Sequence, residues 1–393
     1  MVDVNTRVAV VRTQRNYSEV EEAVREALDL IGGPGSFIQS DQDILIKPNL
    51  LNTKGGESGM TTDSRVTATL VKIAREQGSK VVVGDSSGMR FHGASERVIR
   101  ETGTRSACEA AGGQVVSFDS TPSLRVEIPD ARILKECYVA QPAIEADVII
   151  TVPKFKSHAL TKFTGAVKNQ LGCLPGGQKT IAHRLGSTPE RFAQLLVDLY
   201  TIIRPRLAVM DAVVGIGGLW RSTDRLTPGL IIAGEDAVAV DAVAVRIGGF
   251  DPGDVPTLRI AAESGLGVAD LNCIEIAGSR LEDIAPAHLV SNRRISDLFG
   301  FLFSTLSQFF ISKQNPKVHP EKCTGCTHCL EVCPVEAISM ASDRPLFNLD
   351  ECIRCFCCHE LCPQQAVGID WGLLGNRVMG RSRSSQTSAE TIP

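Results

Sequence analysis

Cysteines near the C-terminal end are the residues whose type and spacing most clearly specify a chemistry. They form two runs, starting at Cys323 and Cys352, and each run has the spacing C-x2-C-x2-C-x3-C-P. Three closely spaced thiolates can converge on one face of an iron–sulfur cluster, and the fourth, followed by proline, reaches another cluster. The spacing therefore predicts two [4Fe–4S] clusters.

The fourth cysteine of each run is expected to serve the cluster of the other run, as in bacterial two-cluster ferredoxins. One cluster would have the ligands Cys323, Cys326, Cys329 and Cys362, and the second would have Cys352, Cys355, Cys358 and Cys333. The runs also match outside the cysteines, where Ala337 aligns with Ala366. We therefore expect a small α+β domain of bacterial ferredoxin type, with one structural unit used twice.

Structural zinc and disulfides are the alternative uses of these cysteines. Zinc motifs normally contain pairs of cysteines, not a triplet with a distant fourth, so the spacing favours clusters. Cys357 is an extra thiol to which the pattern assigns no role.

The composition bounds the class of protein. The 393 residues are 43% hydrophobic and 22% charged, which is typical of a folded protein of two or three domains. A formal charge of −4 gives no reason to expect nucleic acid as a partner. Thiols outside the runs and oxygen-sensitive clusters favour a reducing cytoplasm. We expect a cytoplasmic protein with no transmembrane segment, and nothing in the sequence indicates its oligomeric state.

Hydrophobic patterning predicts the elements that position these residues. Short apolar runs, typical of strands, alternate with segments of helical periodicity from residue 7 to residue 277. The first predicted helix begins with a capping-box motif formed by Ser18 and Glu21. This alternation predicts an α/β domain over residues 1–278, with a mostly parallel sheet flanked by helices. A connector with a Phe/Leu-rich helix (279–317), the ferredoxin domain (318–370) and a disordered tail (371–393) would follow.

Polar residues follow several of the predicted strands. In open parallel sheets, ligands bind beyond the carboxyl ends of the strands. We therefore expect one shared cofactor-binding site there, which His183 would close from a neighbouring segment. Its other members are Lys47, Asn49, Asp85, Gly88 and Asp211. Helix capping by Asp85 and a purely structural role for His183 are the alternatives.

A basic block follows the strand at residues 147–152. Lys154, Lys156 and His158 alternate and would share one face of an extended segment, and Lys168 and Asn169 follow on a helix. Converging cations would hold a carboxylate, a phosphate or a developing enolate, and His158 could transfer a proton. These five residues are our catalytic candidates. A solvated basic loop is the alternative.

Nucleotide-binding motifs are missing from the sequence. No G-x-G-x-x-G opens a helix after the first strand, and no Walker lysine motif occurs. A nicotinamide cofactor is therefore not expected. A flavin or another second cofactor stays open, because many flavin sites have no short motif.

Several of these segments resemble a known family, domain of unknown function 362. The resemblance covers residues 44–267 and rests on Lys47-Pro-Asn49, Asp85 to Gly88, Lys154 to His158, Thr164 to Asn169 and Gly234 to Asp241. Members of this family often carry a C-terminal two-cluster ferredoxin. The resemblance implies an iron–sulfur protein of anaerobic or low-oxygen redox metabolism.

Electron transfer is the function that the sequence favours. Low-potential electrons from two clusters would reach an anionic substrate or cofactor in the α/β domain, which would make the protein an oxidoreductase. The alternatives are a non-catalytic electron carrier, or a factor that reduces another protein's metal centre. Lys322 and Arg354, expected at the surface near the cysteines, would favour docking of an acidic redox partner protein.

Overall fold

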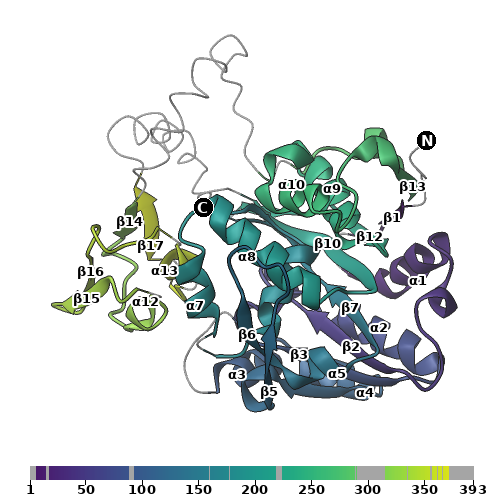
Figure 1. The fold of residues 1–393 in the computed structure, drawn as a ribbon, viewed down its shortest axis with the longest axis horizontal. Coiled ribbons are helices and arrows are strands. Elements are labelled where there is room, and N and C mark those ends of the chain that lie inside the picture. Colours follow the sequence, from purple (N-terminus) through teal and green to yellow (C-terminus); the bar gives the residue numbers. More distant parts are fainter. Residues whose placement is uncertain are drawn as a thin grey trace, which may run out of the picture. The chain divides into compact units, whose positions relative to one another are not determined.

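The computed structural model divides the chain into two compact units, Met1–Ser291 and Asn292–Pro393 (Figure 1). The structure describes residues 6–14, 17–87, 93–158, 160–176, 178–217, 224–287, 289, 315–333, 335–354, 356–360, 362–364 and 366–370. Among the helices of these ranges, none has both the length and the apolar character needed to cross a bilayer.

A mixed and mostly parallel sheet forms the centre of the first unit. Its main path is β13 (Ile274–Gly278), β1 (Thr6–Arg12), β12 (Leu230–Gly234), β10 (Leu207–Gly217), β7 (Val148–Val152), β2 (Asp43–Pro48), β3 (Lys80–Asp85) and β4 (Gln114–Ser117). Along this path only β12 runs antiparallel to its neighbours. The predicted α/β class with a mostly parallel sheet is confirmed.

Helices cover both faces of the sheet because its strands are apolar on both sides. Ala9 and Val11 of β1 belong to a core with α1 (Val20–Leu30) and α2 (Ser64–Glu76). Val8 and Val10 instead belong to a core with α9 (Ala237–Ile247) and α10 (Pro256–Glu263). These two helix pairs lie on opposite sides of the sheet in Figure 1.

The remaining elements of the first unit are short, apart from one long helix. The helices are α3 (Ala94–Glu101), α4 (Thr104–Ala110), α5 (Gln141–Glu145), α6 (Ala166–Asn169), α7 (Gln178–Leu185) and α8 (Pro189–Ile202). β5 (Ser123–Glu127) and β6 (Glu136–Ala140) form a separate hairpin. β8 (Lys154–His158) pairs with β10 and with β9 (Lys162–Thr164), and β11 (Asp224–Leu226) also pairs with β10.

The first unit continues past the boundary that we expected at residue 278. Ile284 and Leu289 are buried in the same core as α9. The Leu289 amide also donates a hydrogen bond to the Gly248 carbonyl at 3.0 Å. The expected Phe/Leu-rich helix and the expected C-terminal tail lie outside the described residues.

The second unit consists of short helices and two-stranded sheets, which agrees with the predicted small α+β domain of ferredoxin type. β14 (Asn315–Val318) pairs antiparallel with β17 (Val367–Asp370), and β15 (Ile338–Ala341) pairs antiparallel with β16 (Arg344–Phe347). Each cysteine run contains one short helix, α12 (His328–Glu331) in the first run and α13 (Cys357–Glu360) in the second.

Candidate functional sites

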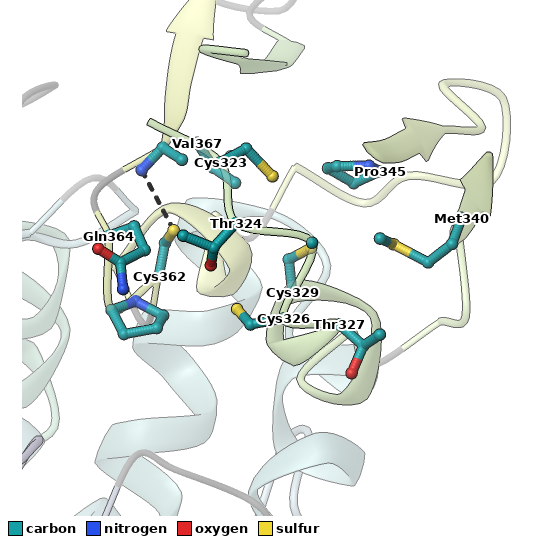
Figure 2. A pocket seen from close by; sticks show the side chains of 13 residues that line it. Cys323, Thr324, Cys326, Thr327, Cys329, Met340, Pro345, Cys362, Gln364 and Val367 are labelled. Atoms are coloured by element: carbon teal, nitrogen blue, oxygen red, sulfur yellow. Dashed lines mark hydrogen bonds between the residues drawn. The ribbon is translucent and has the colours of Figure 1, made fainter. Parts of the chain in front are cut away.

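Cysteines from both runs line one pocket of the second unit. Cys323, Cys326 and Cys329 line a pocket, and Cys362 of the second run lines the same pocket (Figure 2). The spacing predicts this set of four thiols as one group of ligands. The structure brings them together by folding the second run back onto the first.

A second pocket lies beside the other cysteines. Cys352 and Cys358 line it together with Cys333 of the first run. Cys355, the fourth member of the predicted set, lies outside the described residues. Each of the two pockets is therefore lined by thiols from both runs.

The fourth cysteine of each run accepts the same backbone hydrogen bond. The Ala337 amide donates to Cys333 Sγ and the Ala366 amide donates to Cys362 Sγ, both at 3.2 Å. Hydrogen bonds to cluster sulfurs stabilise the thiolate and shift the cluster potential. The alignment of Ala337 with Ala366 in the sequence thus corresponds to an equivalent contact in each half.

The donor set fits an iron–sulfur cluster better than a single metal ion. Within the described ranges, no three Cys, His, Asp or Glu side chains converge closely enough to hold one ion. A zinc ion needs its sulfurs at about 2.3 Å, whereas the thiols here line the wall of a pocket. Thiols spread in this way around an enclosed space suit a cofactor of several atoms.

The two basic residues near the cysteines differ from each other in exposure. Lys322 is exposed, as expected for a docking residue. Arg354 is not at the open surface, and that expectation is wrong: the side chain is half-buried and lines the second pocket.

In the first unit, the sheet has a topological switch point between β2 and β7. The chain runs outward from β2 to β3 and β4 and then returns to β7, on the other side of β2. From β2 it continues to α2 on one face, and from β7 it continues to α8 on the opposite face. Ligands of open α/β sheets bind where the chain diverges in this way.

Lys47 and Thr151 lie at this switch point as register partners on β2 and β7. Alternation along the strands directs both side chains to the face that α8 covers. Asn169 joins the two strands there, because its Nδ2 donates to the Lys47 carbonyl at 3.0 Å and to Thr151 Oγ1 at 2.9 Å.

A buried ion pair extends this arrangement to β3. Lys47 Nζ lies 2.7 Å from Asp85 Oδ1, and both side chains are almost fully buried. Asp85 Oδ2 accepts a hydrogen bond from the Leu50 amide at 2.7 Å. A Cβ at Gly172 would lie 2.1 Å from Asp85 Oδ1 and 2.5 Å from Lys47 Nζ, so glycine allows the following turn to cover the pair.

Lys156 connects to the same group through two amide side chains. Its Nζ donates to Asn49 Oδ1 at 2.7 Å and to the Met60 carbonyl at 3.1 Å. Asn49 Nδ2 in turn donates to Asn169 Oδ1 at 3.3 Å. The structure therefore joins five of the predicted residues in one network, which we call the edge network: Lys47, Asn49, Asp85, Lys156 and Asn169.

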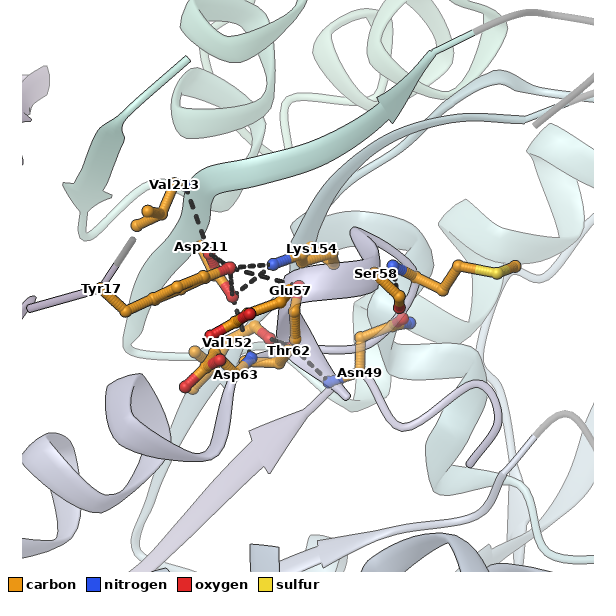
Figure 3. Close-up of polar contacts among 12 residues, drawn as sticks. Tyr17, Asn49, Glu57, Ser58, Thr62, Asp63, Val152, Lys154, Asp211 and Val213 are labelled. Atoms are coloured by element: carbon orange, nitrogen blue, oxygen red, sulfur yellow. Dashed lines mark hydrogen bonds and ion pairs between the residues drawn. The ribbon is translucent and has the colours of Figure 1, made fainter. Parts of the chain in front are cut away.

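Lys154 and Asp211 form a separate cluster with Tyr17 (Figure 3). Lys154 Nζ lies 2.7 Å from Asp211 Oδ2, and the Tyr17 hydroxyl donates to Asp211 Oδ1 at 3.0 Å. Burial lowers the pKa of Lys154 and raises the pKa of Asp211, while the attraction between the two opposes both shifts. Asp211 therefore forms a fully buried ion pair with Lys154 and does not belong to the edge network.

His158 is held as the tautomer that is protonated on Nε2. The amides of Leu160 and Thr161 donate to His158 Nδ1 at 3.2 and 3.1 Å, so Nδ1 presents a lone pair. Phe192 of α8 lies nearly parallel to both predicted histidines, with ring centroids 6.5 Å from His158 and 4.6 Å from His183. Both histidines therefore belong to one aromatic cluster. Gly88 lies outside the described residues.

Lys168, on α6, is half-buried. The first amides of α6 donate hydrogen bonds to Asp241, a residue that our site prediction did not include. Asp241 Oδ1 accepts from the Ala166 amide at 2.6 Å and Oδ2 accepts from the Val167 amide at 3.1 Å. Burial raises the pKa of Asp241 to about 7, although these two hydrogen bonds oppose the rise. Gly165 allows this approach, because a Cβ there would lie 2.1 Å from the carboxylate.

Two further polar contacts were not predicted. Lys179 Nζ, at the start of α7, donates to Ser86 Oγ at 2.8 Å and to the Ser87 carbonyl at 2.7 Å, which ties α7 to the end of β3. Thr164 is the register partner of Lys156 on β9. Its hydroxyl is buried and meets no hydrogen-bond partner among the described residues. Both residues lie in segments that the sequence had singled out, next to His183 and Lys168.

The fold and the cysteine pockets define an α/β protein with a cluster-binding C-terminal unit. Residues 44–246 match the family described as Domain of unknown function (DUF362), and residues 315–363 match the 4Fe-4S dicluster domain. The chain therefore belongs to the DUF362 family and carries a ferredoxin-like cluster domain, which confirms the resemblance seen in the sequence.

Proteins that are similar to parts of the chain include a relative and a solved structure. The thylakoid-associated protein sll1697 of Synechocystis sp. is 31% identical over 248 residues, which cover 63% of this chain and 74% of that protein. The lactate racemase apoprotein from Thermoanaerobacterium thermosaccharolyticum matches at 12% identity with a TM-score of 0.44. That match covers 62% of this chain and 57% of the racemase, which is less than two thirds of its length.

Proposed function

We propose that the protein is an iron–sulfur oxidoreductase. Two [4Fe–4S] clusters in the second unit would pass low-potential electrons to an anionic substrate or cofactor at the edge network of the first unit. The observation that carries this proposal is the buried Lys156 ammonium beside the Thr164 hydroxyl, at the carboxyl edge of the sheet. Bound clusters would supply one-electron reduction, and a reduced one-electron donor protein would supply the electrons.

The groups around Lys156 suit recognition of an anion. Lys156 and Thr164 occupy one register pair, so their side chains lie on the same face of the two strands. Asn49 is half-buried, and its Oδ1 accepts a hydrogen bond from the same ammonium. An ammonium and a hydroxyl are typical donors for a carboxylate or phosphate.

His158 would complete the site two residues along β8. Because alternate residues of a strand share a face, His158 lies on the same side as Lys156. Its Nε2–H can donate a hydrogen bond to negative charge that develops during a reduction. Such a role needs a neutral imidazole with the proton on Nε2, and the amides at Nδ1 fix that tautomer.

Ligand binding tests this proposal without knowledge of the natural substrate. Inorganic phosphate and succinate serve as probes, and thermal unfolding of anaerobically purified protein reports binding through stabilisation. We expect Lys156→Gln and Thr164→Val to weaken binding of the preferred probe at least about tenfold, which is roughly 1.4 kcal/mol. Lys80→Gln, at an exposed lysine, is the control. Equal binding by the wild type and Lys156→Gln would reject the site.

Turnover provides the second part of the test. We expect Lys156→Ala and His158→Ala to retain the clusters and to lose substrate reduction. Unchanged turnover in both variants would reject the catalytic assignment.

An electron carrier or an activator of another metalloprotein is the second candidate function. Exposed Cys326 favours it, because a ligand at the surface brings a cluster close to a docking protein. Oxidation of the reduced clusters distinguishes the two. Oxidation by a small molecule alone supports the oxidoreductase, whereas oxidation only by a partner protein supports the carrier.

A further inference from the structure

The residue directly before the second cysteine differs between the two runs of the cluster domain. Gly325 occupies it in the first run and Arg354 in the second. Both residues have a positive φ, +70° for Gly325 and 55° for Arg354. The backbone turn is therefore of the same kind in both halves, and the difference is a guanidinium in one half alone.

Arg354 directs this guanidinium toward the second pocket. The residue lines that pocket with Cys333, Cys352 and Cys358. Its Nη1 donates to the Cys352 carbonyl at 3.2 Å. Its Nε is buried and meets no acceptor among the described residues. A buried donor of this kind is costly unless an acceptor lies near it.

No equivalent cation lines the first pocket. Of the described residues around it, none is basic. Arg344 lies near the first run, but its Nη1 donates to the Cys323 carbonyl at 2.7 Å and to the Pro320 carbonyl. The guanidinium of Arg344 is thus used to hold the loop.

We propose that Arg354 is the charge partner of one cluster only, to which its Nε–H donates a hydrogen bond, and that it selectively raises the reduction potential of that cluster. This inference rests on the proposed pair of clusters. The second pocket is lined by Ile338, Phe347 and Phe356, and such apolar walls disfavour added negative charge. A guanidinium favours it, and the low polarity of the surroundings strengthens the attraction. The charge of Arg354 thus offsets the unfavourable effect of the apolar walls on the reduced state of a cluster in this pocket.

Redox titration of the full chain, with both clusters loaded and followed by electron paramagnetic resonance, tests the role of Arg354. We expect Arg354→Gln to lower one of the two midpoint potentials and to leave the other unchanged. The ratio of reduced to oxidised cluster in the affected pocket at a fixed potential should fall about tenfold, equivalent to about 59 mV for one electron. Arg354→Lys keeps the charge but loses the Nε–H, so its shift should be smaller. Lys322→Gln removes an exposed charge beside Cys323 and should shift neither midpoint.

The outcomes separate this inference from the function on which it rests. About four irons per chain and a single paramagnetic signal would reject the pair of clusters. About eight irons, with both midpoints unchanged in Arg354→Gln, would reject the role of Arg354 alone. Equal shifts of both midpoints would also reject it, because the effect would not be selective. If Arg354→Gln loses iron, the two midpoint potentials of Arg354→Lys are compared with those of the wild type by the same criteria.

Discussion

Lys47 and Asp85, at the ends of two neighbouring parallel strands, form an ion pair of 2.7 Å that is almost completely sealed from solvent. The pair lies beside the topological switch point, where Asn169 Nδ2 donates a hydrogen bond to the Lys47 carbonyl. The carboxyl ends of β2 and β3 are therefore joined by an ion pair as well as by the backbone hydrogen bonds of the sheet.

Removal of one partner of this pair should destabilise the fold strongly. Lys47→Met would leave a buried carboxylate without its cation, and we expect a loss of about 3–5 kcal/mol in the free energy of unfolding. The double variant Lys47→Met with Asp85→Leu should lose less than Lys47→Met alone. Urea denaturation followed by circular dichroism measures both. Additive losses would show that the two charges do not depend on each other.

Gly172→Ala should disrupt the ion pair between Lys47 and Asp85, because the added Cβ would overlap both charged groups. Overpacking of this kind costs about 1–3 kcal/mol, and thermal unfolding would detect it. Gly55→Ala is the matched control, since a Cβ there meets no atom within 4 Å. Similar melting temperatures for the two variants would contradict the close contact.

Asp241 should make stability depend on pH between about 4 and 7. Its folded-state pKa, raised by burial to about 7, lies above the ordinary value of 3.8. The folded state therefore binds the proton more tightly, so the contribution is fully present below pH 4 and is lost as the pH rises to 7. Asp241→Asn removes this titration.

The free energy of unfolding of the wild type, relative to Asp241→Asn, should fall by roughly 4 kcal/mol over this range, at 1.36 kcal/mol per pKa unit. Urea denaturation of both proteins at several pH values measures the difference. A constant difference would show that the carboxyl group has an ordinary pKa.

The crossing of the cysteines predicts which variants share a phenotype. Cys362→Ala and Cys326→Ala should abolish the same paramagnetic signal, although the two cysteines belong to different runs. Cys358→Ala should abolish the other signal. Cys273→Ala, in the first unit, should leave both unchanged. If Cys362→Ala and Cys358→Ala removed the same signal, each run would hold its own cluster.

Features that follow from local sequence were the ones that could be predicted. Periodicity gave the mostly parallel sheet, because each strand of this kind carries its own apolar run. The cysteine spacing predicted the cluster domain, because three of the four ligands of each cluster lie within seven residues of one another.

Contacts between distant segments were not predictable in the same way. Tyr17 and Asp211 are 194 residues apart, and no local pattern links them. Lys154 and Lys156 lie on one strand, yet their polar partners come from different segments. Lys154 pairs with Asp211 of β10, whereas Lys156 donates to residues that follow β2. Lys179 was overlooked because lysine beside a loop is usually solvated.

Local signals also failed where the surrounding structure offered better contacts. The expected capping box at Ser18 does not form: α1 begins at Val20, and the Ser18 hydroxyl donates to Gln14 Oε1 at 3.1 Å. Similarly, Ile284 and Leu289 extend the first unit beyond residue 278 because the core around α9 buries them.

The position of Cys362 also bears on how the protein is made. A set of thiols that includes Cys362 is incomplete until the ribosome has added that residue, 33 residues after Cys329. Iron delivered earlier would meet only three of the four thiols. Maturation of this set must therefore wait until translation has passed the second cysteine run.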